Sequence, residues 1–300
     1  MGSKMWFGTK EHLEWIDTPL SGADVSSAGW EANGSLLNGG GWGYASFGGH
    51  KNYNFSWSNA SARAAASKME AYRRGSYGRG LIYFHDPLTY DTNILPAHWA
   101  DPSMALGGEA PSLVPGKFPV DIATPANTLN LPIRGARYDF ESGDDRGYPG
   151  ESKSLFIPVP PGYNLRMSAA YVAQNTNLGV YWAGVSAVGV GPATRLAPSQ
   201  LEDPSSFPAT LLTPGLTGVR IWVGRSDTST GALSLYGMVA RLIPAPRDVT
   251  SAPARQGKWA PGDGHSGCVF SGFPTRVNLS GVNGGQVGYA ATFREVGAWR

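Results

Sequence analysis

Four carboxylates stand close together in one short segment of this 300-residue chain, at Asp139, Glu141, Asp144 and Asp145. Carboxylates that converge on a loop can bind Ca²⁺, or can act as the acid and the nucleophile of a glycosidase. Their spacing does not match the ligand positions of a helix-loop-helix calcium site. A solvated turn between two strands is the favoured interpretation, with calcium binding as the alternative and a glycoside hydrolase as a weaker one.

Aromatic side chains in the middle of the chain suggest a second chemistry, the stacking of sugar rings. The candidates, of the kind that carbohydrate-binding modules expose, are Tyr163, Tyr181, Trp182 and Trp222. Tyr181 and Trp182 are consecutive, so a strand places them on opposite faces of its sheet, and one faces outward unless a second layer covers it. Core filling competes with this interpretation, because large aromatic rings also fill sandwich cores.

Other catalytic arrangements are missing from the sequence. The histidines at positions 12, 50, 85, 98 and 265 do not have the short spacing of a zinc site. His85-Asp86 could form half of an acid-base pair, but a turn before Pro87 is favoured. Cys268 is the single cysteine, which excludes an internal disulfide and a zinc site built from several cysteines. The glycines of Asn38–Gly43 lack the Lys and Ser/Thr that follow in a phosphate-binding loop. We expect no enzymatic activity and no cofactor.

The composition favours a soluble protein made mostly of short strands. The 41 Gly and 23 Pro have no collagen-like period and are typical of many tight turns. With 24 basic and 22 acidic residues, the formal net charge of +2 is too small to attract nucleic acid or an acidic membrane surface. No apolar run reaches the length of a membrane span, and the first residues lack the apolar core of a secretion signal. We therefore expect synthesis in a cytoplasm, no nucleic-acid recognition and no membrane insertion.

One segment, Asn59–Arg74, is predicted to form an α-helix within this β-rich chain. Ser58 is a suitable N-cap, and Gly75 stands where a left-handed residue ends a helix. Glu70 and Arg74 form an i,i+4 pair of favourable orientation. The expected packing face repeats every three or four residues and is mostly small: Ala62, Ala65, Ala66, Met69 and Tyr72. Such a face lets a helix lie close against a sheet.

The strand pattern divides the chain into three parts. Residues 1–125 hold an edge strand at Leu13–Ile16, glycine-rich turns over 29–47, an alternating aromatic strand at Tyr53–Trp57, the helix and a proline-rich connector. Residues 126–248 have strands at the spacing of a jelly-roll-like β-sandwich. Residues 249–300 are too few for a core of their own, so they either return to the first domain or extend the sandwich. The predicted fold is mostly β, with an N-terminal β-sandwich or split barrel carrying one helix, and a second, jelly-roll sandwich.

Several aromatic and glycine-rich segments accompany the predicted helix. They are Trp6-Phe7-Gly8, Trp15-Ile16, Ser21-Gly22-Ala23, Leu37–Gly41, Tyr53–Trp57 and Leu81–Pro87. With the helix they resemble the minor tail proteins of long-tailed phages of actinobacteria, and more broadly the distal tail protein family. Thr292–Trp299 also resembles terminal segments of such proteins. The resemblance covers about the first hundred residues, and the middle of the chain shares only the sandwich pattern.

The resemblance implies a structural virion protein at the phage tail tip. In that family the N-terminal domain forms a ring, usually a hexamer, between the tail tube and the tip hub, and a galectin-like or carbohydrate-module-like sandwich projects outward. The implied partners are further copies of the chain, the tail tube protein, the tip hub protein and a host surface glycan. The basic helix residues that a neighbouring subunit or solvent could contact are Arg63, Lys68, Arg73 and Arg74. The family supplies no catalytic motif. A carbohydrate-binding protein, alone or beside a glycoside hydrolase, is the alternative.

Overall fold

The structure is a computed structural model in which the chain divides into two compact units. It describes residues 4–19, 24–28, 31–35, 41–45, 50–85, 93–100, 120–123, 134–143, 146–151, 154–198, 216–244, 264–265, 267–278 and 287–296. Unit 1 comprises Met1–Asp86 and Gly267–Gly297, and unit 2 comprises Pro87–Ser266 and Ala298–Arg300. Residues 87–125, which the sequence analysis placed in the first domain, fall in unit 2, and the segment 249–300 is divided at Gly267.

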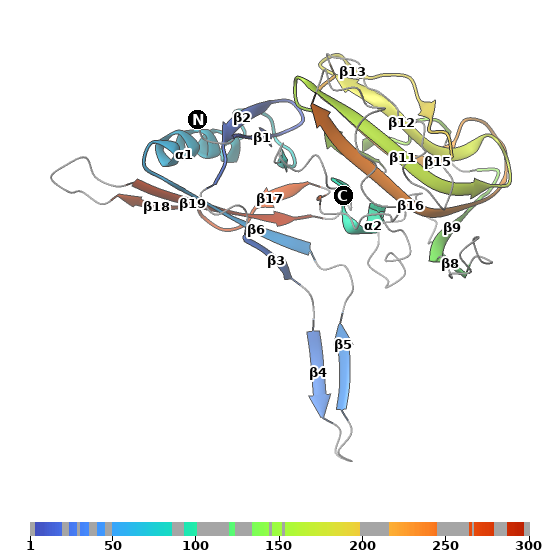
Figure 1. The fold of residues 1–300 in the computed structure, drawn as a ribbon, viewed down its shortest axis with the longest axis horizontal. Helices are drawn as coiled ribbons and strands as arrows, with labels where there is room; N and C mark the ends of the chain where they lie inside the picture. The colour runs from blue at the N-terminus through green and yellow to red at the C-terminus, as the bar shows by residue number, and fades with distance from the viewer. Residues whose placement is uncertain are drawn as a thin grey trace. The chain divides into compact units, whose positions relative to one another are not determined.

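The described strands of unit 1 form three antiparallel sheets (Figure 1). The first has the order β2-β1-β7, with β1 at Lys4–Gly8, β2 at Leu13–Asp17 and β7 at Tyr83–His85. The second has the order β17-β19-β6-β3, formed by Cys268–Phe270, Val287–Glu295, His50–Ser58 and Asp24–Ala28, with β18 (Thr275–Asn278) paired to β19. The third is a hairpin of β4 (Glu31–Ser35) and β5 (Gly41–Ala45).

The prediction of turns over 29–47 is therefore wrong. The error arises because glycine is depleted in strands, so the glycines of this hairpin hide its alternating pattern.

The C-terminal strand β19 lies inside the second sheet, between β17 and β6. It pairs with β6 from Gly288 opposite Ser58 to Arg294 opposite Asn52. Because a central strand hydrogen-bonds on both sides, unit 1 is completed by a segment distant in sequence from its other strands.

Helix α1 (Asn59–Arg73) follows β6 directly and packs its small-residue face inward. Ala62, Ala65, Met69 and Tyr72 are buried, in agreement with the predicted face. The C-terminus is a Schellman motif: Gly75, at φ +74°, donates its N–H to Tyr72 O at 2.9 Å, and Ser76 N–H donates to Ala71 O at 2.9 Å.

The N-terminus of α1 differs from the prediction. Ser58 is the N-cap residue and has extended backbone geometry, but its hydroxyl makes no capping hydrogen bond. Asn59 adopts a positive φ of 53°, which asparagine tolerates better than most other residues. The sharp change of direction from strand to helix is therefore made by the backbone of Asn59.

The core of unit 1 is mainly aromatic and lies between α1 and the two larger sheets. Phe7, Phe55 and Phe293 are buried, and the ring centroids of Phe7 and Phe293 are 5.5 Å apart in an edge-to-face arrangement. Trp57, 2% exposed, donates its indole N–H to Asp17 O at 2.8 Å. The predicted half-buried strand at Tyr53–Trp57 thus turns its aromatic residues inward.

Unit 2 is a β-sandwich of two antiparallel sheets (Figure 1). One sheet has the order β10-β15-β12-β13, formed by Leu155–Pro158, Gly218–Arg225, Leu178–Ser186 and Gly189–Val190, with β14 (Thr194–Arg195) also paired to β12. The other has the order β11-β16-β9-β8, formed by Tyr163–Ala173, Gly231–Pro244, Arg134–Phe140 and Val120–Ala123. Buried aliphatic and aromatic side chains of both sheets make one core. These observations confirm the prediction of a mostly β protein with a β-sandwich.

Two short segments close the sandwich of unit 2. Leu196 N–H donates to Val180 O of one sheet, and Leu196 O accepts from the Tyr171 hydroxyl of the other at 2.5 Å. Asn93, fully buried, donates to Met238 O and accepts from Ala240 N–H. It leads into the helical turn α2 (Ala97–Ala100), from which Trp99 enters the core. Among the described residues, no helix is both long and apolar enough to cross a membrane.

Candidate functional site

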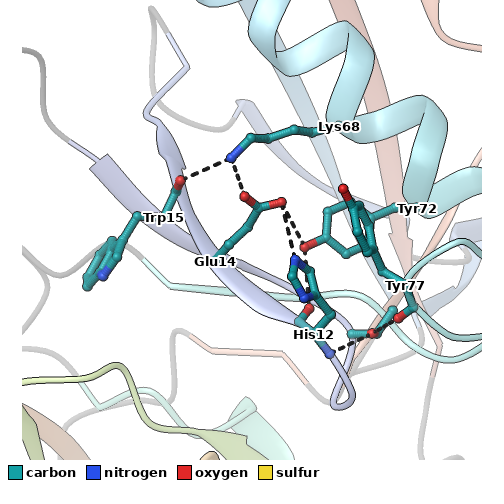
Figure 2. A network of polar contacts seen from close by, with 7 residues as sticks. His12, Glu14, Trp15, Lys68, Tyr72 and Tyr77 are labelled. Carbon is teal, nitrogen blue, oxygen red and sulfur yellow. Dashed lines mark hydrogen bonds and ion pairs between the residues drawn. The ribbon is translucent and has the colours of Figure 1, made fainter.

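A network of polar side chains joins β2 to the second half of α1 (Figure 2). Glu14 on β2 is its centre: Oε2 accepts a hydrogen bond from Lys68 Nζ, and Oε1 accepts one from the Tyr72 hydroxyl at 3.3 Å. Lys68 Nζ also donates to Trp15 O at 3.4 Å. Lys68 and Tyr72 are one helical turn apart, so one carboxylate of the sheet binds two successive turns of the helix.

The turn between β1 and β2 extends this network. The His12 ring stacks on the Tyr77 ring with centroids 4.2 Å apart and planes inclined by 14°. His12 Nε2 lies 3.7 Å from Glu14 Oε1, and the Tyr72 hydroxyl also donates to His12 O at 3.3 Å. Thr9 Oγ1 accepts from the His12 N–H at 3.2 Å and donates to Tyr77 O at 2.5 Å. These contacts fix the turn against the residues that follow α1.

Glycine at position 8 is required for this close approach. Gly8 has φ +148°, and a Cβ there would lie 2.0 Å from His12 O and 2.8 Å from the Tyr72 hydroxyl. A backbone oxygen cannot move away as the end of a long side chain can. The geometry of the network is therefore set by the β1 backbone as well as by the polar groups.

The contact of Glu14 with Lys68 and the Tyr72 hydroxyl, which we call the clasp, has the charges of a structural contact. Burial, together with the charge and hydrogen bond of Glu14, raises the pKa of Tyr72 well above its usual value, so its hydroxyl stays a hydrogen-bond donor. The carboxylate of Glu14 is paired with Lys68, and their side chains are 22% and 33% exposed. A general base must be able to reach the proton that it abstracts, whereas Glu14 is engaged by α1. We therefore assign this cluster to holding α1 on β2.

A second charged cluster lies at the C-terminal end of α1. Glu70 accepts hydrogen bonds from Arg73 Nε and Nη2, both at 3.0 Å, and from Arg74 Nε at 2.8 Å. The hydrogen bonds from Arg73 and then Arg74 lower the pKa of Glu70 to about 2. The guanidinium carbon of Arg73 lies 5.8 Å from the ring centroid of Phe273, in the turn between β17 and β18. Phe273 is 88% exposed, so this cluster presents an aromatic ring to the outside.

The four basic helix residues proposed for a subunit contact thus have different environments. Lys68 is engaged with Glu14 inside unit 1, whereas Arg73 and Arg74 share the carboxylate of Glu70. Arg63 is exposed on the first half of the helix. Arg63, Arg73 and Arg74 remain at the surface for a neighbour to contact, and Lys68 has an internal role.

Two of the four aromatic residues considered for sugar binding are buried in unit 2, and two are partly buried. Tyr181 and Trp222 are cross-strand partners on β12 and β15 with stacked rings, and they are 4% and 0% exposed. The Tyr148 ring packs edge-on against Trp222 with centroids 5.3 Å apart. Trp182 and Tyr163 are half-buried against the main core. The prediction that Tyr181 and Trp182 face opposite sides is correct, but the side that carries Tyr181 and Trp222 is covered, so these two rings present no free face, whereas Tyr163 and Trp182 remain partly exposed.

The segment that covers the outer face of this sheet is held by Arg220. This arginine is 5% exposed and lies over the ring of Phe156, with its guanidinium carbon 5.1 Å from the centroid. Its Nη1 donates to Glu151 O and Ser154 O, each at 3.3 Å. A buried guanidinium that donates to backbone carbonyls anchors the segment that carries Tyr148, which is why the outer aromatic residues are not available to a ligand.

Among the residues whose side chains are described, the remaining sequence candidates do not converge on a site. Asp139 and Glu141 are exposed, and Asp139 pairs with Arg137 at 3.0 Å, while Asp144 and Asp145 lie outside the described residues. His85 and His265 are buried, at 8% and 5% exposure. Within the described segments, no group of three or more His, Cys, Asp or Glu side chains could hold a metal ion.

Sequence reasoning missed the residues that organise unit 1. Glu14 belongs to no recognisable sequence motif. Its role becomes visible only when β2 is placed beside α1 in the structure. Phe273 stands in a Ser-Gly-Phe-Pro turn, and an aromatic residue between Gly and Pro is a signal that could have indicated exposure. Searches against family models, curated proteins and solved structures found no match for this chain.

Proposed function

We propose that this chain is a structural virion protein: a distal tail subunit that forms a ring, of about six copies by the family resemblance, between the tail tube and the tail-tip hub. The proposal rests on the resemblance of the first hundred residues and on features of unit 1 that suit assembly. Its expected neighbours are further copies of itself, the tube protein and the hub protein. The function is mechanical, so the relevant surfaces are strand edges and exposed turns.

The observation that carries the proposal is the hairpin of β4 and β5 (Figure 1), which stands between β3 and β6 in the chain. Among the described strands, the two pair only with each other. The register sets Gly34 beside Trp42 and Ala32 beside Tyr44. A hairpin of two strands is marginally stable in water by itself. A neighbouring copy that packs against it would stabilise it, so we infer that it is an assembly arm.

An open sheet edge in unit 1 supports the same conclusion. In the described part of the unit, β3 is an outer strand of the sheet that contains β6 and β19. Outer strands expose unpaired backbone groups that bind other strands, and soluble proteins usually protect them. Closed assembly into a ring satisfies such edges and prevents open-ended association.

Most of unit 2 is an insertion in the chain of unit 1, between Asp86 and Gly267. We propose that it decorates the outside of the tail tip and assists host attachment. Its outward aromatic residues are buried, so attachment would use surfaces other than Tyr181 and Trp222.

The experiment that tests this function has two readouts. Purified chain is examined by native mass spectrometry and negative-stain microscopy for rings, and gold-labelled antibody against the chain is applied to particles of the phage that encodes it. We expect closed rings and label at the junction of tube and tip. Absence of label from the particles would refute the proposal.

The role of the hairpin is tested by replacing residues 30–46 with a short Gly-Ser turn. We expect the ring to be lost while unit 2 keeps its thermal transition. The control replaces Val188, in the exposed turn between β12 and β13 of unit 2, with Ser and should leave the rings intact. Rings that form without the hairpin would show that it is not the assembly arm.

A further inference from the structure

We infer that Phe273, beneath the guanidinium of Arg73, is a knob that binds the Glu11–His12–Tyr77 surface of the adjacent copy of this chain. This inference rests on the proposed ring and identifies a contact that closes it. Its two halves are the knob at the C-terminal end of α1 and an acceptor surface at the β1–β2 turn. Each half is described on unit 1 itself.

The knob has the composition of a protein-interface hot spot. Phe273 is 88% exposed, and its turn is shaped by Gly272 at φ +77° and by Pro274. Arg73 is held over the ring by its two hydrogen bonds to Glu70, each 3.0 Å long. Aromatic and arginine side chains dominate binding energy at interfaces, and preorganised groups lose less entropy on binding. Leaving such a ring in water is unfavourable.

The charge of the knob indicates the chemistry of its partner. Arg73 and Arg74 share one carboxylate, so the cluster keeps an excess of one positive charge. A partner surface that combines a carboxylate with a ring face would complement it. Unit 1 presents such a surface at the turn between β1 and β2.

The acceptor surface combines an acidic group with stacked rings. The Glu11 side chain is 45% exposed, and its Oε1 forms a long ion pair with Lys10 Nζ, at 4.0 Å. Its carboxylate lies over Gly78, where a Cβ would be 2.7 Å from Oε2, so glycine leaves room beside it. The adjacent His12 and Tyr77 rings are stacked, and the His12 side chain is 44% exposed. This surface can receive both an aromatic ring and a guanidinium.

The two halves are on different sides of the last turn of α1. Tyr72 contacts His12 and Glu14 of the first sheet, whereas Arg73 contacts Phe273 in the β17–β18 turn of the second. They do not share a residue, so a copy can use its knob and its acceptor with two different neighbours. A contact of this head-to-tail type generates rings when the rotation closes.

The test uses two surface variants that each disable one half, Phe273→Ser and Glu11→Lys, with the purified full chain. Both positions are exposed, and circular dichroism verifies that folding is retained. We expect each variant to associate at least about tenfold more weakly than the wild type in sedimentation velocity. Mixing the two variants restores one intact junction, so the mixture should form dimers that do not grow into rings. Val188→Ser, at a 99% exposed position of unit 2, is the matched control and should assemble normally.

Each outcome decides the inference. Normal rings from Phe273→Ser or from Glu11→Lys would overturn it, as would a mixture that stays monomeric while the wild type forms rings. A wild type that stays monomeric at every concentration would overturn it as well. The labelling of virions tests the proposed function independently, so labelled tail tips with unaffected variants would refute this contact and leave the ring function standing.

Discussion

Replacing Glu14 with Gln tests the role of the clasp between β2 and α1. The change keeps the size of the side chain and removes the charge that binds Lys68 and the Tyr72 hydroxyl. The pair is partly shielded, at 22% and 33% exposure, so its contribution lies between those of surface and buried ion pairs. We expect unit 1 to lose about 1–2 kcal/mol of unfolding free energy. That loss corresponds to a population of open molecules about 5 to 30 times larger.

Cys268 provides a local assay for this change, because it is the single cysteine and is fully buried in the core of unit 1. Burial raises the pKa of its thiol well above the usual value, so a thiol reagent reacts when unit 1 opens. The labelling rate should rise by the same factor of about 5 to 30 in Glu14→Gln, as long as reclosing is faster than the reaction. Glu141→Gln, at an exposed position of unit 2, is the control and should label as slowly as the wild type.

A double-mutant cycle with Lys68→Met separates the ion pair from the other contacts. Once Lys68 is gone, Glu14→Gln should cost about 1 kcal/mol less than it does in the wild type. A coupling of zero, or labelling of Glu14→Gln at the wild-type rate, would show that the clasp does not hold α1.

Three further predictions concern backbone geometry and pH. Asn59→Val should lower the unfolding free energy by about 1–2 kcal/mol because position 59 has φ 53°, whereas thermal melts of Asn59→Gly should change much less. Gly8→Ala should speed Cys268 labelling by more than any other variant here, because its Cβ would lie 2.0 Å from His12 O; wild-type labelling would contradict this clash. Burial raises the pKa of Tyr171 to about 12. Its stabilising contribution is therefore complete below a pH of about 10 and is lost as the pH rises through about 12, and melts of Tyr171→Phe should show a shallower alkaline decline than the wild type.

Local signals in the sequence predict α1 and several strands well. Alternating aromatic residues identify β6, and alanines at helical spacing identify the buried face of α1. Gly75 marks the helix end because a left-handed residue there favours glycine. These features depend on residues that are close in sequence, and that is why they can be read from the chain alone.

Features that depend on distant parts of the chain could not be predicted in the same way. The partner of β19 is β6, more than two hundred residues earlier, and alternation within a strand does not identify its neighbour. The burial of Trp222 also required tertiary information, because its cover comes from the segment with Tyr148. Glu14 is one of 22 acidic residues, and the sequence does not distinguish it from the others. Its structural role is recognised from its contacts with Lys68 and Tyr72.

The backbone hydrogen bonds between Ile82 and Cys268 have a consequence for replacing the segment inserted between Asp86 and Gly267. Ile82 N–H donates to Cys268 O, and Cys268 N–H donates to Ile82 O, both at 2.8 Å. The chain leaves unit 1 after Asp86 and returns at Gly267, so the exit and the entry are joined by a single bridge of two hydrogen bonds. A short loop can span such a gap, because closing a small loop costs little entropy. We therefore expect that the segment 87–266 can be removed, enlarged or replaced while the strands of unit 1 keep their register.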